Sequence, residues 1–233
     1  IVDAVCALLS STQDVAPRDY TGKTVLITAG PTREPLDPVR YLSNRSSGKM
    51  GYALAEAALA RGAQVTLVSG PVSLAPIPGV EMIPVQTTQD LYQTLMTQSI
   101  KFHIVIQAAA PADYRAETVS PQKIKKQGDA PLVLRLVQNP DVAAAVGAQK
   151  QPGQILVGFA AETENVLSHA EQKLEKKNLD MIIVNDVTLP GAGFDVDTNI
   201  ATFITRNASQ SFPLQTKRHL ADAILDAILQ LEK

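Results

Sequence analysis

The feature that most constrains the fold is a regular alternation of short apolar runs with amphipathic segments, which begins at Lys23. Runs rich in β-branched residues predict strands at 24–29, 63–69, 103–109, 154–160 and 180–185. Amphipathic segments between them predict helices at 51–62, 87–98, 139–149 and 165–178. Because strands that alternate with helices form a parallel sheet covered on both faces, the sequence predicts an α/β fold.

The C-terminal part of the chain departs from this alternation. Two β-forming runs at 199–206 and 210–215 predict an antiparallel hairpin, and 217–232 predicts a last helix. The expected fold is therefore a Rossmann-like parallel sheet with helices on both faces and a C-terminal antiparallel extension. An isolated hairpin is only marginally stable in water, so we expect the segment from about Phe194 to Pro213 to need a partner.

Composition limits what the protein can bind. The formal net charge of -2 over 233 residues argues against a nucleic-acid-binding protein, which would carry a strong basic excess. No stretch of the sequence reaches transmembrane length, so we expect no membrane partner. Cys6 is the only cysteine, which excludes an internal disulfide and fits a cytoplasmic location.

The first residues differ in character from the rest. The run "IVDAVCALL" (1–9) predicts a short apolar helix in which Cys6 is packed, and it lacks the basic segment and cleavage pattern of a signal peptide. The polar stretch 10–22 predicts a linker. We therefore expect residues 1–22 to be the tail of a preceding domain and a linker, and residues 23–233 to form a single domain.

The stretch "RYLSNRSSGKMG" (40–51) is a candidate anion site. It is not the P-loop of a nucleoside triphosphatase, because Ser43 occupies the first glycine position and Met50 replaces the hydroxyl residue after Lys49. Serine, glycine and lysine before an apolar helix still predict a helix N-terminus that can receive an anion. In a parallel sheet, such loops lie at the carboxyl ends of the strands, where ligands bind.

An NAD(P)-dependent oxidoreductase is one alternative for this fold, but its motifs are missing. The loop after the first strand has a single glycine, Gly30, before its prolines, so the fingerprint G-x-G-x-x-G is absent there. None of the five tyrosines has a lysine four residues later, so the Tyr-x-x-x-Lys motif of short-chain dehydrogenases is absent as well.

Several longer strings occur in one order along the chain: "TAGPTREPLDPVRYLSNRSSGKMG", "AAAPADYR", "KIKK", "NPD", "VGFAAET" and "NDV". Over about residues 22–230, the chain resembles the phosphopantothenate–cysteine ligase family. Pro111 departs from the family pattern, in which a small aliphatic residue more often precedes "ADY". By the same resemblance, residues 1–9 look like the end of a flavin-dependent decarboxylase domain that is fused to the ligase in many bacteria.

The resemblance implies an activity for residues 23–233, which would form a nucleotide-dependent ligase domain. Members of the family join 4'-phosphopantothenate to L-cysteine in coenzyme A biosynthesis. The bacterial type first activates the carboxylate with CTP, which gives an acyl-cytidylate and pyrophosphate. The resemblance therefore implies CTP as co-substrate, Mg²⁺ held mainly by the triphosphate, and a homodimer built partly from about Phe194 to Pro213. A nucleotide-sensing module without catalysis is the other hypothesis.

The resemblance also implies site residues. Arg40 and Asn44 are assigned to the acyl intermediate, which the Asn44 amide would orient, and Lys123 would offset charge at the α-phosphorus. Gly30, Ser46, Ser47 and Gly48 are expected to bind substrate or phosphate. The nucleotide is expected to contact Ala109, Ala110, Asp113, Lys123, Asn139, Pro140, Asp141, Phe159, Lys173 and Lys177, with Asp113 as a candidate Mg²⁺ ligand.

Several of these residues also have a purely structural explanation. Lys173 and Lys177 lie four residues apart and could pair with neighbouring glutamates on an exposed helix face. Lys123 could belong to a solvated basic run, and Asn44 and Asp113 could stabilise turns. The three histidines are scattered along the chain and are not expected to be catalytic.

Overall fold

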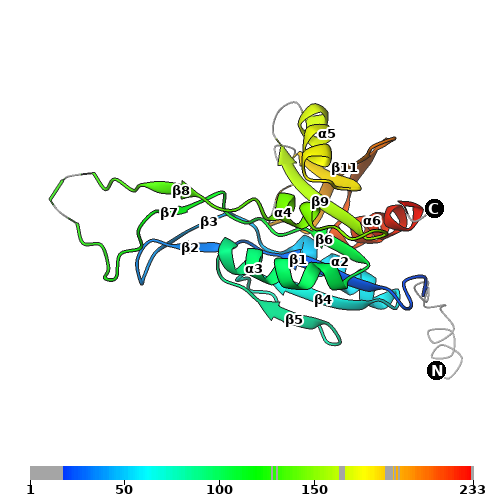
Figure 1. Ribbon diagram of the computed structural model, residues 1–233, viewed down its shortest axis with the longest axis horizontal. Helices are drawn as coiled ribbons and strands as arrows, with labels where there is room; N and C mark the ends of the chain where they lie inside the picture. Colours follow the sequence, from blue (N-terminus) through cyan, green and yellow to red (C-terminus); the bar gives the residue numbers. More distant parts are fainter. Residues whose placement is uncertain are drawn as a thin grey trace, which may run out of the picture.

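The computed structural model describes residues 18–126, 128–129, 131–162, 166–186, 191, 193 and 195–231, with the side chains of 161, 162, 166–169 and 186 left out. Its centre is an eight-stranded sheet of order β12-β11-β10-β9-β6-β1-β4-β5 (Figure 1). Six strands are parallel: β1 (Thr24–Ala29), β4 (Gln64–Ser69), β5 (Glu81–Pro84), β6 (Ile104–Gln107), β9 (Ile155–Glu162) and β10 (Met181–Asp186). The predicted Rossmann-like sheet is confirmed, with β5 as an additional edge strand.

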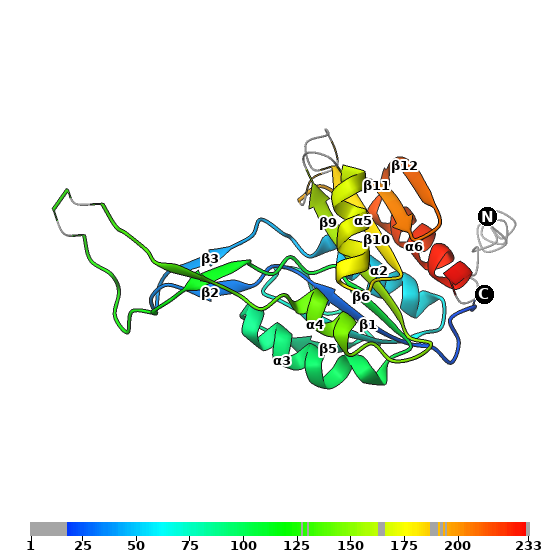
Figure 2. The same cartoon turned by 45° about the horizontal axis from the view of Figure 1, so that its top comes forward.

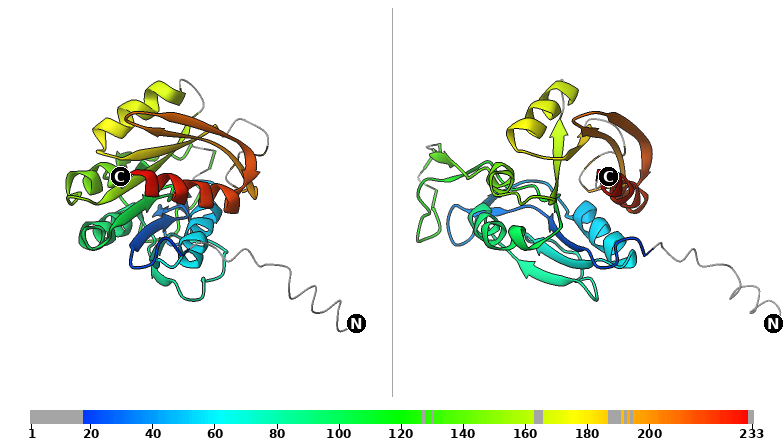
Figure 3. Two further views of the ribbon diagram at one scale, coloured as in Figure 1. Left: turned by 90° about the vertical axis from the view of Figure 1, so that its right-hand side faces the viewer. Right: turned by 45° about the vertical axis from the view of Figure 1, so that its right-hand side comes forward.

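The helices lie on both faces of the sheet, as Figure 3 shows. α2 (Lys49–Ala60) and α6 (Lys217–Leu231) cover one face, and α3 (Thr88–Gln98), α4 (Val142–Ala148) and α5 (Val166–Lys176) cover the other. A short 3-10 helix, η1 (Ser99–Lys101), follows α3. Among the described residues, no helix is long and apolar enough to cross a membrane.

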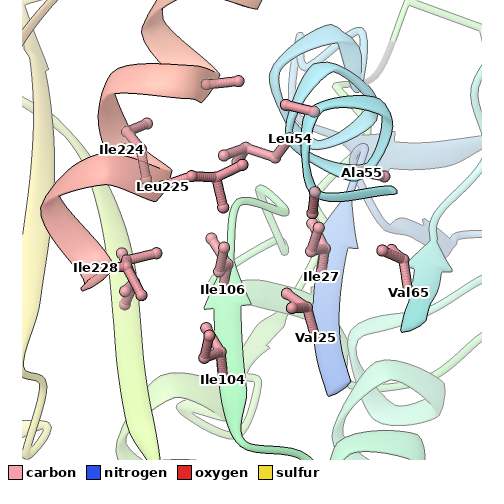
Figure 4. Packing of buried hydrophobic residues seen from close by; sticks show 14 of the residues in the cluster. Val25, Ile27, Leu54, Ala55, Val65, Ile104, Ile106, Ile224, Leu225 and Ile228 are labelled. Atoms are coloured by element: carbon pink, nitrogen blue, oxygen red, sulfur yellow. The ribbon is translucent and has the colours of Figure 1, made fainter. Parts of the chain in front are cut away.

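Each central strand is buried on both sides, which explains its nearly continuous apolar sequence. In β1, Val25 and Ile27 face α2 and α6, whereas Leu26 faces the opposite helices, because successive side chains of a strand alternate between faces. Figure 4 shows Ile224, Leu225 and Ile228 of α6 packed toward α2 and the central strands. These contacts fix the first helix of the domain against the last.

The sheet reverses its strand order beside β1. From β1 the chain proceeds outward to β4 and β5, then returns to place β6 on the other side of β1. A crevice forms at the carboxyl ends of two strands that diverge in this way. An isolated parallel bridge between Pro31 and Ala110 joins the two loops that leave β1 and β6.

An arm extends from these two loops and was not predicted. It consists of one ribbon formed by β2 (Arg33–Pro35) and β3 (Tyr41–Ser43), a second formed by β7 (Tyr114–Ala116) and β8 (Leu136–Gln138), and the chain between β7 and β8. Figures 1 and 2 show that the arm projects well beyond the sheet. Each of its strands has three residues, too few for a periodic pattern to show in the sequence.

The C-terminal hairpin is part of the main sheet. β11 (Thr198–Thr205) pairs antiparallel with β10, and β12 (Ser209–Thr216) pairs antiparallel with β11 and forms the edge. The hairpin is therefore not isolated, and its stability does not require the partner that we expected. Phe194, at the start of that predicted interface, lies outside the described residues, as does Cys6.

The chain enters the domain earlier than predicted. Tyr20, which falls in the expected linker, is fully buried, and its hydroxyl donates to the carbonyl of Leu225 at 2.7 Å. Arg61 at the end of α2 binds Asp19 and Asp226 through its guanidinium, at 2.6 and 2.7 Å. Residues 19 and 20 are thus fixed to α2 and α6 and belong to the folded domain.

Candidate active site

A cleft of about 850 Å³ lies at the carboxyl edge of the sheet, where the sequence predicted a ligand. This volume accommodates a nucleotide-sized ligand. Most of the predicted site residues line the cleft: Asn44, Ser46, Gly48, Ala109, Ala110, Asp113, Asn139, Pro140, Asp141, Phe159, Lys173 and Lys177. Gly30, Ser47, Arg40 and Lys123 are not among the described residues of the wall.

Asn44 lies where β3 ends and the chain turns toward α2. Its Nδ2 donates to the carbonyls of Ala110 and Pro111, both at 3.1 Å. The side chain thereby joins the "SNRSSGK" segment to the loop after β6. With Nδ2 bound to the protein, the Oδ1 atom is the part of the amide that can meet a donor group of a ligand.

The N-terminus of α2 forms one wall of the cleft. Gly48 is its N-cap with φ of 81° and no side-chain cap, so the first amides of the helix point out as donors. Gly30, directly beneath, also has positive φ, and its carbonyl accepts from Ala110 N at 2.9 Å. Lys49 binds Asp197 at 2.8 Å and the carbonyl of Asp195 at 2.7 Å, and Asp197 raises the pKa of this lysine. The wall combines helix amides with a cation.

The loop after β6 is held by hydroxyl and amide groups. Ala109 N donates to Thr28 Oγ1 at 3.0 Å, and Ala112 N donates to Thr32 Oγ1 at 2.9 Å. Asn139 Nδ2 donates to the carbonyl of Ala112 at 2.8 Å. These bonds fix the backbone of the loop after β6, which is predicted to contact the nucleotide. Asn139 joins this loop to the chain that follows β8.

At the opposite wall, Lys177 and Asp141 form an ion pair at 3.0 Å. The Oδ1 atom of Asp141 also accepts from Ala144 N at 3.0 Å and caps α4. Burial raises the pKa of Asp141, but the Ala144 amide and Lys177 outweigh it, and the net pKa is lowered. Lys173 and Phe159 line the same region. The two lysines thus face the cleft and do not form only the exposed helix face considered above.

The carboxylates of the cleft could supply few ligands to a metal ion. Among the described residues, no group of three or more His, Cys, Asp or Glu side chains could hold one. Asp113 contributes one exposed carboxylate to the wall, and Asp141 is paired with Lys177. A Mg²⁺ ion here would need phosphate oxygens for most of its ligands, with Asp113 as one candidate protein ligand.

Arg40 and Lys123 lie in the arm. Arg40 binds the buried carboxylate of Asp37 and donates to the carbonyl of Ile124 at 2.6 Å, so the two predicted cations are neighbours. The four residue-to-residue steps from Arg40 to Asn44 run along β3 and span about 13 Å. Within one chain, the structure therefore brings Arg40 together with Lys123 but separates both from Asn44.

The cleft also contains polar residues that were not predicted, among them Gln107, Asn185, Asn199 and Lys217. Gln107 Nε2, Asn185 Oδ1 and Asn199 Nδ2 are buried without a hydrogen-bond partner among the described residues. Burial, with repulsion from Lys49, lowers the pKa of Lys217. The "NDV" motif contains Asn185 and could have indicated it, whereas Asn199 and Lys217 depend on how the hairpin joins the sheet.

The chain is similar to known proteins over most of its length. A family model described as "DNA/pantothenate metabolism flavoprotein C-terminal domain" matches residues 20–231. The coenzyme A biosynthesis bifunctional protein CoaBC of Vibrio cholerae is 50% identical over 214 residues, covering 91% of this chain and 54% of that protein. CoaBC of Escherichia coli K12 is 47% identical over 232 residues, covering 98% and 56%. The chain spans about half the length of these curated relatives.

Two solved structures are similar in fold to this chain. The crystal structure of the C-terminal domain of CoaBC superposes with a TM-score of 0.77 and 41% identity, covering 91% of this chain and 97% of that one. A Cab2 H337A mutant in complex with phosphopantothenate-cysteine has a TM-score of 0.76 and covers 99% of this chain and 93% of its own. At 18% identity the second match shows likeness of fold.

Proposed function

Since this chain belongs to the family of the DNA/pantothenate metabolism flavoprotein C-terminal domain, we propose that it is a ligase of coenzyme A biosynthesis. It joins 4'-phosphopantothenate and L-cysteine to give 4'-phosphopantothenoylcysteine. The observation that carries this proposal is the cleft, in which Asn44, the α2 N-terminus and the Lys177–Asp141 pair converge. Such a site offers donors and cations to two anionic substrates in a protein with little net charge.

The proposed reaction has two steps. A carboxylate oxygen of 4'-phosphopantothenate attacks the α-phosphorus of CTP, which releases pyrophosphate and leaves an acyl-cytidylate. The cysteine amine then attacks the acyl carbon, loses a proton, and displaces CMP with the electrons of the broken C–O bond. Phe159, Lys173, Lys177 and Asp113 bind the nucleotide. Asp113 and the phosphate oxygens would hold a Mg²⁺ ion, which would supply positive charge to the triphosphate. The Asn44 amide orients the acyl group for the second step.

We further propose that the enzyme works as a homodimer in which the arm of one copy completes the cleft of the other. Arg40 and Lys123 lie in the arm, away from the cleft of their own chain, so a second copy is the simplest source of these cations. The arm also exposes apolar side chains: Val39 is 61% exposed, Tyr41 and Tyr114 48%, and Leu136 42%. Contact between arms would bury this surface.

The domain is proposed to follow a flavin-dependent decarboxylase domain in a bifunctional cytoplasmic protein. Support comes from the name of the relatives and from the length of those proteins that this chain does not cover. Flavin chemistry would belong to that preceding domain.

The reaction is tested by following pyrophosphate release with CTP or ATP, with and without phosphopantothenate and cysteine. The proposal expects release only when nucleotide and phosphopantothenate are both present, and a marked preference for CTP. Binding of CTP with no turnover under any of these conditions would identify a nucleotide sensor. Equal turnover with both nucleotides would contradict the CTP assignment.

The residue roles are tested by quenching the reaction of labelled phosphopantothenate and measuring acyl-cytidylate and amide separately. Asn44→Asp puts a carboxylate beside an anionic intermediate, so it should impair the second step most. Lys123→Gln should reduce formation of the acyl-cytidylate, because loss of one such contact costs on the order of 3 kcal/mol of barrier. Equal loss of the first step in both folded variants would contradict the role of Asn44.

The shared site is tested by mixing two inactive variants. Arg40→Ala lacks the arm cation, and Asn44→Asp lacks the cleft amide. If the arm serves the partner's cleft, subunit exchange between them produces some dimers with one intact site, and activity returns. No recovery, or a concentration-independent monomer by sedimentation, would refute the shared site.

A further inference from the structure

The carboxylate of Asp37, which lies outside the cleft, accepts hydrogen bonds from three backbone amides and from the Arg40 side chain. Its Oδ1 accepts from the backbone amides of Val39 and Arg40 at 2.8 and 2.9 Å. Its Oδ2 accepts from Arg40 Nε at 2.9 Å and from the amide of Ile124 at 3.1 Å. The side chain has no exposed surface, and Arg40 holds the pKa of this carboxyl far below its ordinary value.

The two oxygens of Asp37 have different connections. Oδ1 closes the turn between β2 and β3, within the same ribbon. Oδ2 instead reaches a segment 87 positions away in the chain. Both backbone groups of Ile124 are bound there, because its amide donates to Asp37 and its carbonyl accepts from Arg40. A further bond, from Ser120 N to the carbonyl of Leu36 at 2.9 Å, ties the same two segments.

Ile124 lies between Lys123 and Lys125, both exposed. A lysine in a free loop pays a large conformational entropy cost when it is ordered against a ligand. Fixing the backbone of Ile124 removes part of this entropy cost before a ligand binds. Cations that are already in position stabilise the charge that develops in the transition state best. The Asp37–Arg40 pair thus has a geometry suited to setting the position of Lys123.

We propose that Asp37 is a positioning residue for the nucleotidyl-transfer step, which holds Arg40 and the Lys123 segment together as one pre-arranged cationic unit. This inference rests on the proposed function, because it assigns the unit to the triphosphate of the nucleotide. Asp37 touches no substrate. It acts on the first step through Lys123, so its effect on that step must disappear when Lys123 is already removed.

Asp37→Asn tests this role with little change of shape. Asparagine keeps an oxygen for the turn amides, but its amino group then faces the donors of Arg40 and Ile124 and the arm link is lost. We expect acyl-cytidylate formation to fall on the order of 10- to 100-fold, as when a reacting group is misplaced. The second step, measured from isolated acyl-cytidylate, should fall less, because Lys123 is assigned to the first step alone. Equal loss in both steps would mean a structural role only and would overturn the proposal.

A double-mutant cycle separates positioning from general damage. The double variant Asp37→Asn with Lys123→Gln should be no slower than Lys123→Gln alone, because the two residues act through one contact. Asp90→Asn is the matched control, since the Asp90 carboxylate also accepts two backbone amides, in the capping box of α3. The fold-reductions in the rate of the first step caused by Asp90→Asn and by Lys123→Gln should multiply in the double variant. If the fold-reductions caused by Asp37→Asn and by Lys123→Gln multiply in the same way, the inference is overturned.

Two further measurements keep the outcomes distinct. Amide hydrogen exchange at Ile124 should accelerate in Asp37→Asn and stay unchanged in Asp90→Asn, with no substrate present. If Asp37→Asn does not fold, Ile124→Pro removes the N–H that donates to Asp37 and should also slow the first step, whereas normal kinetics would refute the role. If Lys123→Gln itself reacts like the wild type, the role proposed for Lys123 fails, and the inference about Asp37 fails with it.

Discussion

At the scale of single residues, Gly51 decides how closely α2 approaches β1. A Cβ atom at this position would lie 2.5 Å from the Cβ of Ala29 and 2.9 Å from the carbonyl oxygen of Thr28. Both distances are below van der Waals contact. The absence of a side chain therefore lets the N-terminus of α2 rest on the end of β1, where it forms the cleft wall.

Gly51→Ala should push this helix end outward. We expect the free energy of unfolding to fall by about 1–3 kcal/mol, as in other overpacked cores. The KM for CTP or phosphopantothenate should rise as the helix amides move. Glu56→Ala, on the exposed part of α2, is the control and should alter neither quantity appreciably. Urea denaturation and steady-state kinetics measure the two effects, and unchanged stability would contradict the close packing of Gly51.

At the scale of elements, the short helix α4 depends on its cap. Asp141 accepts from Ala144 N and pairs with Lys177, so one carboxylate stabilises the helix and places a cleft cation. Asp141→Ala should cost about 1 kcal/mol of stability, the usual value for an N-cap. Asp141→Asn should retain most of the cap and lose the ion pair. Urea denaturation of both variants checks that Asp141→Ala loses more stability than Asp141→Asn.

The pH dependence of these variants follows from the sign of the shift. The folded-state pKa of Asp141 is lowered from 3.8, so its ionic stabilisation is complete above that value and is lost as the pH falls through the folded pKa. The stability gap between wild type and Asp141→Asn should therefore be constant near neutrality and close below about pH 4. A gap that widens in acid would contradict the assignment.

The same scale shows how much of the structure the sequence predicts. The strands at 24–29 and 180–185 were predicted within a residue, because burial on both faces makes them continuous apolar runs. β5 was missed because its four residues end in a proline at the sheet edge. The arm was missed because its ribbons depend on pairing between distant loops and on Asp37, which no local pattern records.

The candidate site was predicted unevenly for a related reason. Asp113 lies at the cleft because it belongs to the loop after β6, and the sheet topology brings such loops together. Arg40 and Lys123 were expected there too, but the length of the arm cannot be judged from spacing. Asn199 becomes a cleft residue only when the hairpin joins the sheet.

At the scale of the whole molecule, Arg61 connects three distant segments. Its side chain is 3% exposed and binds Asp19, Asp226 and the carbonyl of Asp222. Arg61→Lys cannot reproduce this planar set of bonds and should lower stability by about 2 kcal/mol. Arg218→Lys, whose pair with Asp222 is exposed, should cost less than about 0.5 kcal/mol. Chemical denaturation compares them, and equal losses would contradict the role of Arg61.

The packing of α6 on α2 has a consequence for biosynthesis of the chain. A ribosome releases β1 and α2 long before α6, yet the apolar face of α2 is covered by Leu220, Ile224 and Ile228 of that last helix. During translation, this face stays open to water and to other nascent chains until residue 228 has left the exit tunnel. Lys217 is the first residue of α6, so this wall of the cleft is completed only when the last helix packs on α2.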